Sequence, residues 1–196
     1  MLKIYLQFYN FSLSLLWAIV LVLFVADSGK LDFVSLTLLN IAQGAALLEI
    51  LHAALKWVKS PVFTTAIQVS SRIFILILIN IFHGGPWPEF MGISGLQLAV
   101  FAWSLTEIIR YAYYLTLLRN TSIAVLTWCR YTFFIFLYPI GVTGELMILY
   151  AWATQHGIAV DQWQVWFMAV VAVLYILFFP KMYLYMWKQR KEKILN

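Results

Sequence analysis

The chain of 196 residues is too apolar to be a soluble protein of this size. Hydrophobic residues make up 64% of it, charged residues make up only 11%, and the mean hydropathy is +0.88. A single soluble core could not bury so much apolar surface, so the composition predicts a polytopic membrane protein. The only cysteine, Cys129, excludes an internal disulfide framework and a metal site built from several cysteines. The net charge of +5 comes mostly from basic residues at segment ends and in the tail, so we expect no nucleic-acid partner.

Six stretches of the sequence are long and apolar enough to cross a bilayer, which takes roughly 20 residues in a helix. They cover residues 4–26, 33–55, 62–82, 91–117, 123–149 and 162–187. Short connections rich in Gly, Pro or charged residues separate them, at 27–32, 56–61, 83–90, 117–122 and 153–161. Consecutive helices should therefore be antiparallel. The prediction is an all-α, six-transmembrane-helix bundle that forms one domain over residues 1–196, with the first stretch retained as a helix.

The basic residues are divided unequally between the two sides of this bundle. The side with both termini has nine of them, namely Lys3, Lys56, Lys59, Arg119, Lys181, Lys188, Arg190, Lys191 and Lys193, whereas the other side has only Lys30. Because cytosolic loops are enriched in Lys and Arg, we expect both termini to be cytosolic.

Several ionisable residues lie inside the predicted spans. They are Glu49, His52, Arg72, Glu107, Arg110, Arg130 and Glu145. A charge at the centre of a membrane helix costs on the order of 3 kcal/mol, so these side chains should face the interior of the bundle. Glu107 and Arg110, three residues apart, share a helix face, as do Glu49 and His52. Two interpretations remain open: a buried ion network that fixes helix packing, and a polar cavity that receives an anionic part of a substrate.

Five basic residues lie toward the cytosolic half and form a candidate substrate-binding group. They are Arg110, Arg119, Arg130, Lys56 and Lys59. Arginine and lysine at a cavity mouth suit phosphate groups. Basic residues at a cytosolic boundary also have an ordinary topological role.

The segment LYPIGVTGEL, at 137–146, places polar groups in an apolar span. Tyr138 and Glu145 are seven residues apart, nearly two helical turns, so they should project from one face with their Cα atoms roughly 10 Å apart. Pro139 favours a kink, and Gly141 and Gly144 allow close approach of a neighbouring helix or a ligand. The spacing predicts a pocket in which a phenol and a carboxyl face each other.

This pair has the groups that a β-elimination of water needs. A carboxylate in an apolar site can remove a proton next to a carbonyl, while a phenol can protonate the departing hydroxyl, and the reverse assignment of base and acid is the alternative. No HExxH motif, Walker loop or zinc cluster provides a rival site, and no metal or redox cofactor is implied. A phosphatase loop starting at Cys129 would need arginine at position 135, where Ile135 stands, so phosphatase chemistry is excluded. A structural hydrogen bond or a proton relay is the alternative role of the pair.

Several motifs resemble the 3-hydroxyacyl-CoA dehydratase family, also called protein-tyrosine-phosphatase-like. They are LEILHAALKWVKSP, TTAIQVSSR, AWSLTEIIRYAYY and RYTFFIFLYPIGVTGEL, and the likeness runs from about residue 10 to the end. The resemblance implies a six-span protein of the endoplasmic reticulum that converts (3R)-3-hydroxyacyl-CoA to trans-2-enoyl-CoA in very-long-chain fatty acid elongation. The family's catalytic tyrosine and glutamate, in YPxGxxGE, correspond here to Tyr138 and Glu145.

The resemblance also implies an acyl-CoA substrate and a place in the lipid bilayer. An elongase, a ketoacyl-CoA reductase and an enoyl-CoA reductase are the protein partners that it suggests. The basic tail, YMWKQRKEKILN, does not have the strict spacing of a dilysine retrieval signal, so the cell inner membrane of a bacterium is the alternative location.

Two other functions of the chain are alternatives to that of a dehydratase. One is a non-catalytic member of the same fold that binds acyl-CoA or elongation enzymes. The other is a small proton-coupled transporter that uses Glu49, Glu107 and Glu145 as a relay. The inverted repeats that would support a transporter are absent from the sequence.

Overall fold

The computed structural model describes residues 1–82, 87, 89–155 and 163–195, and they are almost entirely helical. The helices are α1 (Leu2–Ala26), α2 (Phe33–Ala45), α3 (Leu47–Ala54), α4 (Val62–Ile81), α5 (Gly95–Leu118), α6 (Ala124–Thr132), α7 (Phe134–Gln155) and α8 (Trp163–Arg190). A short hairpin of β1 (Glu89–Phe90) and β2 (Ile93–Ser94) precedes α5, and a π-helical segment, η1 (Lys191–Leu195), follows α8. The predicted connections at 83–90 and 153–161 lie partly outside the described residues.

Among the described residues, five helical stretches are long and apolar enough to cross a membrane. They are Leu2–Ala26, Phe33–Ala54, Val62–Ile81, Phe134–Ala153 and Val165–Ile194. Helix α5 has sufficient length, but it is less apolar because it contains Glu107, Arg110 and three tyrosines. The predicted all-α polytopic membrane protein is therefore confirmed.

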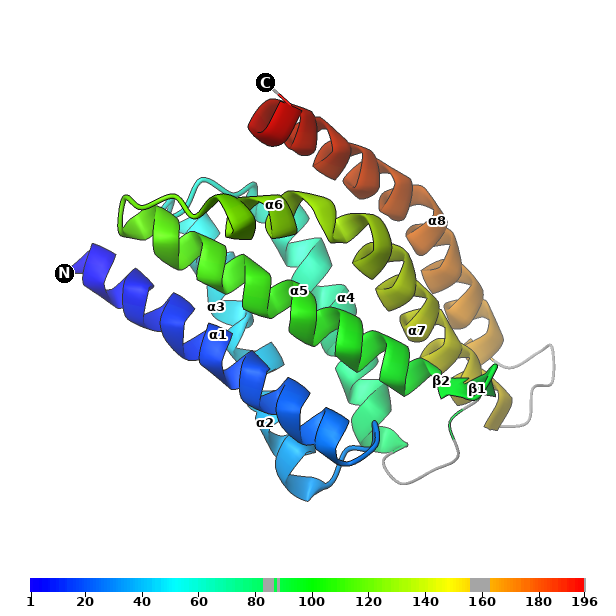
Figure 1. Cartoon of the computed structure of the whole chain (residues 1–196). Helices are drawn as coiled ribbons and strands as arrows, with labels where there is room; N and C mark the ends of the chain where they lie inside the picture. The colour runs from blue at the N-terminus through cyan, green and yellow to red at the C-terminus, as the bar shows by residue number, and fades with distance from the viewer. Residues whose placement is uncertain (83–86, 88, 156–162, 196) are drawn as a thin grey trace.

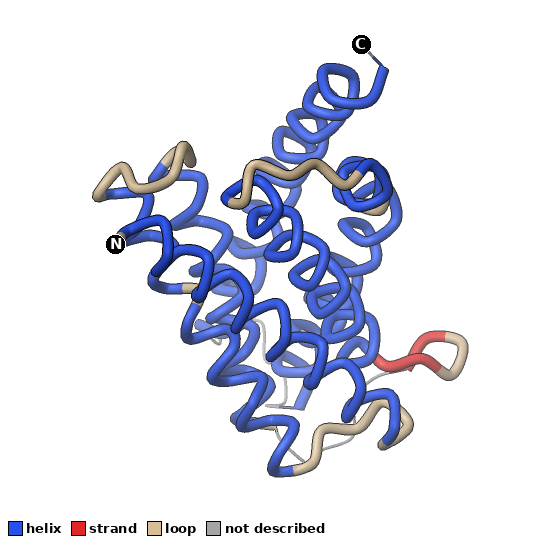
Figure 2. Tube along the Cα trace, turned by 60° about the vertical axis from the view of Figure 1, so that its left-hand side comes forward, coloured by secondary structure: helices blue, strands red, loops and turns tan. Residues whose placement is uncertain are grey.

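Helix α5 lies at the centre of the bundle, where it packs most extensively against α1 and α7 (Figure 1). Its central position explains its composition, since polar side chains in α5 face other helices rather than lipid. The long helical stretches alternate in direction, and both termini lie at the same end of the molecule (Figures 1 and 2). The connections α3–α4 and α5–α6 lie at that end too.

Two of the predicted spans are each divided into two helices. The stretch predicted at 33–55 is interrupted at Ala46, two residues after Gly44, which weakens a helix because glycine has more backbone freedom. The stretch predicted at 123–149 is interrupted at Phe133. Helix α7 then continues through Pro139 as far as Gln155, so the interruption lies six residues before the proline at which a kink was expected.

The close approach predicted for the glycines of α7 is present at Gly144. A Cβ atom at this position would lie 2.5 Å from the backbone nitrogen of Ala99 and 2.7 Å from the backbone oxygen of Gly95, both in α5. At Gly141, a Cβ would lie 3.5 Å from the Cβ of Ala102, an ordinary contact. The α5–α7 crossing therefore depends on a pair of glycines, Gly95 and Gly144.

Side-chain caps fix two helix starts on the side of the bundle opposite the termini. Asp32 accepts a hydrogen bond from the backbone N–H of Ser35 at 2.8 Å, and Ser94 forms a reciprocal capping box with Gln97 at the start of α5. The hydrogen bonds from Ser35 lower the pKa of the Asp32 carboxyl from its ordinary value. The carboxylate therefore stays ionised at the start of α2, where a negative charge is favourable.

Candidate active site

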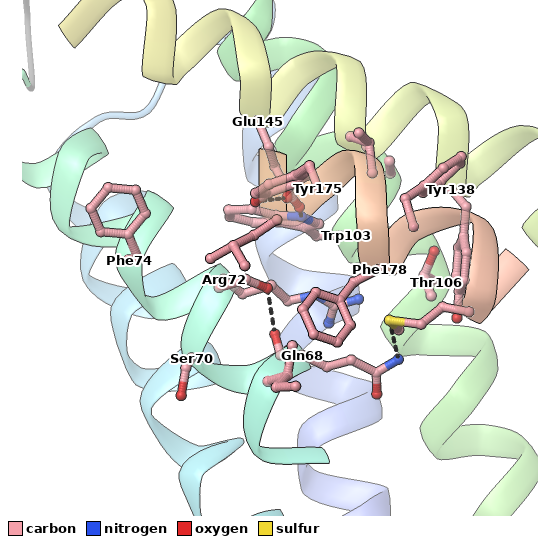
Figure 3. A pocket seen from close by; sticks show the side chains of 18 of the residues that line it. Gln68, Ser70, Arg72, Phe74, Trp103, Thr106, Tyr138, Glu145, Tyr175 and Phe178 are labelled. Carbon is pink, nitrogen blue, oxygen red and sulfur yellow. Dashed lines mark hydrogen bonds between the residues drawn. The ribbon is translucent and has the colours of Figure 1, made fainter. Parts of the chain in front are cut away.

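A cavity of about 400 Å³ lies between α4, α5, α7 and α8 (Figure 3). Its walls are mostly apolar, with a small number of polar groups that point inward. The lining residues that can donate or accept hydrogen bonds through their side chains are Gln68, Ser70, Ser71, Arg72, Trp103, Thr106, Tyr138, Glu145 and Tyr175. An apolar chamber with a few convergent polar groups is the usual form of a small-molecule site.

Tyr138 and Glu145 both line this cavity. Helix α7 carries both residues on one face, with Gly141 and Val142 of the cavity wall between them. The predicted arrangement of a phenol and a carboxyl on one face of a helix is therefore present. Tyr138 is near the start of α7, on the side of the chain termini, and Glu145 is about two turns further into the bundle.

The carboxyl of Glu145 is buried and accepts a hydrogen bond on each oxygen. The indole Nε1 of Trp103 donates to Oε1 at 2.7 Å, and the phenol of Tyr175 donates to Oε2 at 2.5 Å. Because an indole N–H can only donate, this contact fixes Oε1 as an acceptor. The two donors come from α5 and α8, so neighbouring helices orient the carboxyl toward the cavity.

Sequence reasoning missed Trp103 and Tyr175. Neither residue is part of a recognisable catalytic motif, and both look like the many other aromatic side chains of an apolar helix. Only the crossing of α5 and α8 over α7 brings their polar atoms to Glu145 (Figure 3).

Arg72 links the cavity to a buried ion network. It lines the cavity from α4, and its guanidinium donates to Glu107 of α5. Glu107 also accepts from Arg110, with the Nε–Oε2 distance at 2.7 Å, which confirms the predicted pairing of these two residues. Glu107 is therefore held between two guanidinium groups.

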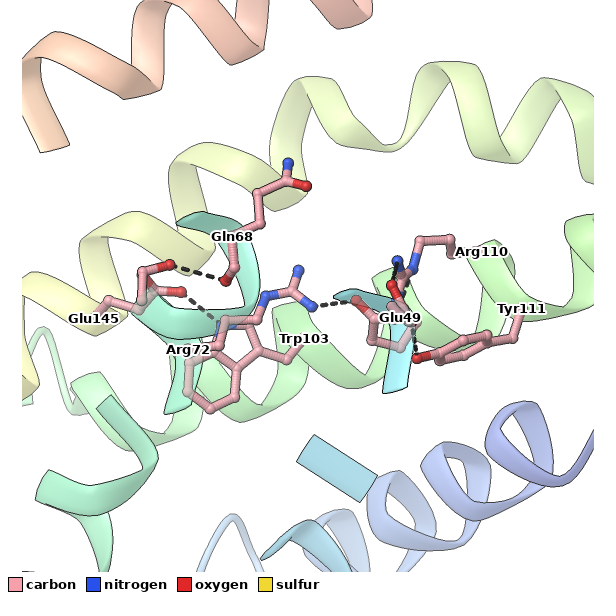
Figure 4. A network of polar contacts seen from close by, with 9 residues as sticks. Glu49, Gln68, Arg72, Trp103, Arg110, Tyr111 and Glu145 are labelled. Carbon is pink, nitrogen blue, oxygen red and sulfur yellow. Dashed lines mark hydrogen bonds and ion pairs between the residues drawn. The ribbon is translucent and has the colours of Figure 1, made fainter. Parts of the chain in front are cut away.

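The network continues from Arg110 to α3 (Figure 4). Two nitrogens of Arg110 contact the two oxygens of Glu49, at 2.7 and 2.6 Å, and the phenol of Tyr111 also donates to Glu49. Two arginines and two glutamates thus form a charge-balanced chain across α3, α4 and α5. Balanced pairing with hydrogen bonds is what buried charges require, so the interpretation of these residues as an ion network that fixes helix packing agrees with the structure.

The basic residues expected at a substrate mouth do not line the cavity. The guanidinium of Arg110 is occupied by the two carboxylates, and Arg130 lines a separate small pocket of about 10 Å³, beside Tyr114. Lys56, Lys59 and Arg119 are exposed near helix ends. The structure therefore does not bring these five residues together around the cavity.

His52 and Glu49 have different partners, although they share a helix. His52 lies 3.0 Å from the phenol oxygen of Tyr5 and packs against Tyr9 and Trp57, on the side of α1. Glu49 points to α5 instead. Across the described parts of the chain, no group of three or more His, Cys, Asp or Glu side chains is placed to hold a metal ion.

Sequence comparison identifies the family to which this fold and cavity belong. The profile described as "Protein tyrosine phosphatase-like protein, PTPLA" matches residues 43–196. The chain belongs to the PTPLA family. The match extends from α2 to the C-terminus and therefore includes every residue that lines the cavity.

Curated relatives of this chain are about a third identical to it over the aligned residues. The very-long-chain (3R)-3-hydroxyacyl-CoA dehydratase hpo-8 of Caenorhabditis elegans is 38% identical, over 79% of this chain and 75% of the relative. The very-long-chain (3R)-3-hydroxyacyl-CoA dehydratase 2 of Homo sapiens is 36% identical, over 98% of this chain and 81% of the relative. The very-long-chain (3R)-3-hydroxyacyl-CoA dehydratase PASTICCINO 2 of Arabidopsis thaliana is 32% identical, over 98% of this chain and 93% of the relative. No solved structure matches the chain.

Proposed function

We propose that this protein is a membrane-embedded hydro-lyase that dehydrates (3R)-3-hydroxyacyl-CoA to trans-2-enoyl-CoA in the fatty acid elongation cycle. The observation that supports this most is the apolar cavity lined by both Tyr138 and Glu145, in a chain whose relatives are named as dehydratases of this substrate. The cavity offers a carboxylate, a phenol and an apolar space for an acyl chain.

Glu145 is the base in this proposal. Both of its oxygens accept hydrogen bonds, from Trp103 and Tyr175, and each oxygen has a further lone pair that can take a proton. The carboxylate removes the proton from C2, and the electron pair of that C–H bond forms the C2–C3 double bond. Because the site is apolar and the carboxyl is held by Trp103 and Tyr175, little reorganisation is needed during the reaction.

Tyr138 is the acid in this proposal. Its phenol donates a proton to the C3 hydroxyl as the C3–O bond breaks, so that the leaving group is water. Tyr138 is nearer than Glu145 to the end of the bundle where the chain termini and most of the basic residues lie. A substrate that enters from that end with its acyl chain first passes Tyr138 before it reaches Glu145.

The coenzyme A moiety is then left at the end of the bundle that carries the basic residues. We infer that both termini are cytosolic, that the six helical stretches form one domain, and that the membrane is that of the endoplasmic reticulum. The exposed Lys56, Lys59 and Arg119 at this end suit the phosphates of coenzyme A. Arg110 acts at a distance, through its ion pairs with Glu49 and Glu107. The elongase and the two reductases of the cycle are the protein partners that this role implies.

A proton-coupled transporter is less well supported by these contacts. Glu49 and Glu107 are both paired with arginines, and a carboxylate held in an ion pair is a poor relay for protons. The network therefore favours a structural role for these two glutamates and leaves Glu145 as the carboxyl of the cavity.

The test is a dehydration assay on the purified protein with a long-chain (3R)-3-hydroxyacyl-CoA. We expect Glu145→Gln and Tyr138→Phe each to lower kcat by about 100-fold or more, the usual contribution of a general acid or base. Glu192→Gln and Tyr185→Phe make the same chemical changes outside the cavity and should leave kcat unchanged. Parent-like turnover by both cavity variants would refute the site, and tight substrate binding without turnover by the parent protein would favour a non-catalytic role.

A further inference from the structure

The wall of the cavity between α4 and α8 is closed at two points. At the end nearer the chain termini, the side-chain nitrogen of Gln68 lies 3.9 Å from the sulfur of Met182. At the deeper end, the rings of Phe74 and Phe167 pack edge to face with centroids 5.5 Å apart. Gln68 and Phe74 are six residues apart, so the two contacts are separated by roughly 9 Å along α4. Backbone contact between α4 and α8 is sparse throughout.

The cavity reaches the outer surface of the molecule between these two contacts. Ser70 of α4 and Leu174 of α8 both line the cavity, yet Ser70 is exposed and Leu174 is 44% exposed. A side chain that faces both a cavity and the outer surface lies at the edge of an opening. Figure 3 shows Ser70 and Phe74 on α4 and Phe178 on α8. We call the gap between Ser70 and Leu174 the lateral opening.

The lateral opening faces the apolar layer of the membrane. The outward residues around it on the two helices are mostly apolar, and those with more than half of their surface exposed include Ile77, Val170, Val173, Ile176 and Leu177. Both helices are among the stretches that can span a membrane. Lipid chains therefore surround the opening. An acyl chain of a substrate that emerges there would lie in an apolar medium of the same kind.

The size of the cavity requires such an exit for a long substrate. A volume of about 400 Å³ is near the lower limit for sites that hold drug-sized molecules, which occupy roughly 300–1,000 Å³. It can hold the thioester and the first carbons of a chain, but not a very long acyl chain as well. The relatives are named for very-long-chain substrates, so the remainder of the chain needs another place.

We propose that the acyl chain leaves the cavity through the lateral opening and lies in the bilayer while C2 and C3 are held at Glu145 and Tyr138. This inference depends on the proposed dehydratase function and extends it to the binding of the substrate tail. The protein then contacts only the first part of the chain, so chain length beyond the opening has little influence on binding to the protein itself.

The experiment places a large side chain at the lateral opening. Ser70→Trp fills the gap from α4, and Leu174→Trp enlarges the side chain on α8. Ile81→Trp is the matched control, because Ile81 is a residue near the end of α4, 61% exposed, that neither lines the cavity nor lies beside the opening. The substrates are (3R)-3-hydroxybutyryl-CoA, whose chain ends inside the cavity, and (3R)-3-hydroxystearoyl-CoA, whose chain must pass the opening. The measured quantity is kcat/KM for each substrate.

We expect Ser70→Trp to lower the ratio of long-chain to short-chain kcat/KM about 10-fold, while turnover of the short substrate shows that the variant is folded. The control should keep the ratio of the parent protein. An unchanged ratio in both Ser70→Trp and Leu174→Trp would overturn the lateral opening as the exit. A parent protein that dehydrates neither substrate would instead refute the proposed function.

Discussion

Hydrogen bonding at Glu145 determines how this carboxyl can act. Trp103 and Tyr175 reach it from two different helices and engage both of its oxygens. A carboxyl with a single partner could rotate in the cavity, whereas two donors on opposite oxygens fix its plane. Neither donor needs to touch the substrate, so we regard Trp103 and Tyr175 as positioning residues rather than catalytic ones.

Removing one of these donors should affect turnover more than substrate binding. For Tyr175→Phe and Trp103→Phe we expect kcat to fall by about 10- to 100-fold with little change in KM, because a small misplacement of a reacting group has effects of this size. Tyr185→Phe, on the same helix as Tyr175, and Trp128→Phe are exposed controls and should resemble the parent protein. A rise in KM with unchanged kcat would show that these residues bind substrate instead.

At the scale of helices, the site depends on how closely α5 and α7 pack. Gly95 and Gly144 let the two backbones approach, and this approach brings Trp103 of α5 to Glu145 of α7. The residue next to Gly144 is Glu145 itself, so a shift of α7 at the crossing would move the carboxyl directly.

A methyl group at position 144 should therefore disturb both stability and activity. Its nearest neighbours are backbone atoms of Ala99 and Gly95, which cannot rotate away, so we expect Gly144→Ala to destabilise the protein by about 1–3 kcal/mol, as overpacking does. Gly44→Ala is the matched control, because a Cβ there meets nothing within 4 Å. The midpoint of thermal unfolding in detergent should fall for the first variant and not for the second. Equal midpoints would show that the crossing adapts without cost.

At the scale of the whole molecule, the ion network of Glu49, Arg72, Glu107 and Arg110 connects three helices behind the cavity. Every charge in it has a partner of opposite sign, and Glu107 and Arg110 each have two. The network holds α3, α4 and α5 together on the side of the cavity away from α8, so it provides a fixed wall opposite the sparsely packed helix. This contrast fits the proposal of a rigid catalytic side and a lateral opening that faces lipid.

Loss of Arg110 should therefore weaken the entire bundle. Arg110→Ala leaves two buried carboxylates without their shared partner, and we expect it to cost about 3–5 kcal/mol of stability, the usual consequence of breaking a buried ion pair. Arg110→Lys should recover only part of the loss, because lysine cannot contact both oxygens of Glu49 through two parallel hydrogen bonds. Arg119→Ala, an exposed change at the end of the same helix, is the control in thermal unfolding measurements. Wild-type stability of Arg110→Ala would contradict a structural role of the network.

The sequence by itself determined the membrane class, most of the helices and the pairing of Glu107 with Arg110. These follow from the composition and from spacing along one helix, which are local properties of the chain. The match of Tyr138 and Glu145 to the YPxGxxGE motif is also a local property, because it depends on positions close together in the sequence. The interruptions at Ala46 and Phe133 were not predicted, because a long apolar run gives no signal of a break within it.

Only the tertiary structure decided which side chains meet across helices. Trp103 and Tyr175 reach Glu145, Arg72 reaches Glu107, and Arg110 turns to Glu49 rather than to the cavity. In an apolar span each aromatic or charged residue can face several neighbouring helices. The angle and position at which the helices cross determine which of these neighbours it contacts. The cavity and its lateral opening arise in the same way, since they are spaces between elements and no single segment of the sequence encodes them.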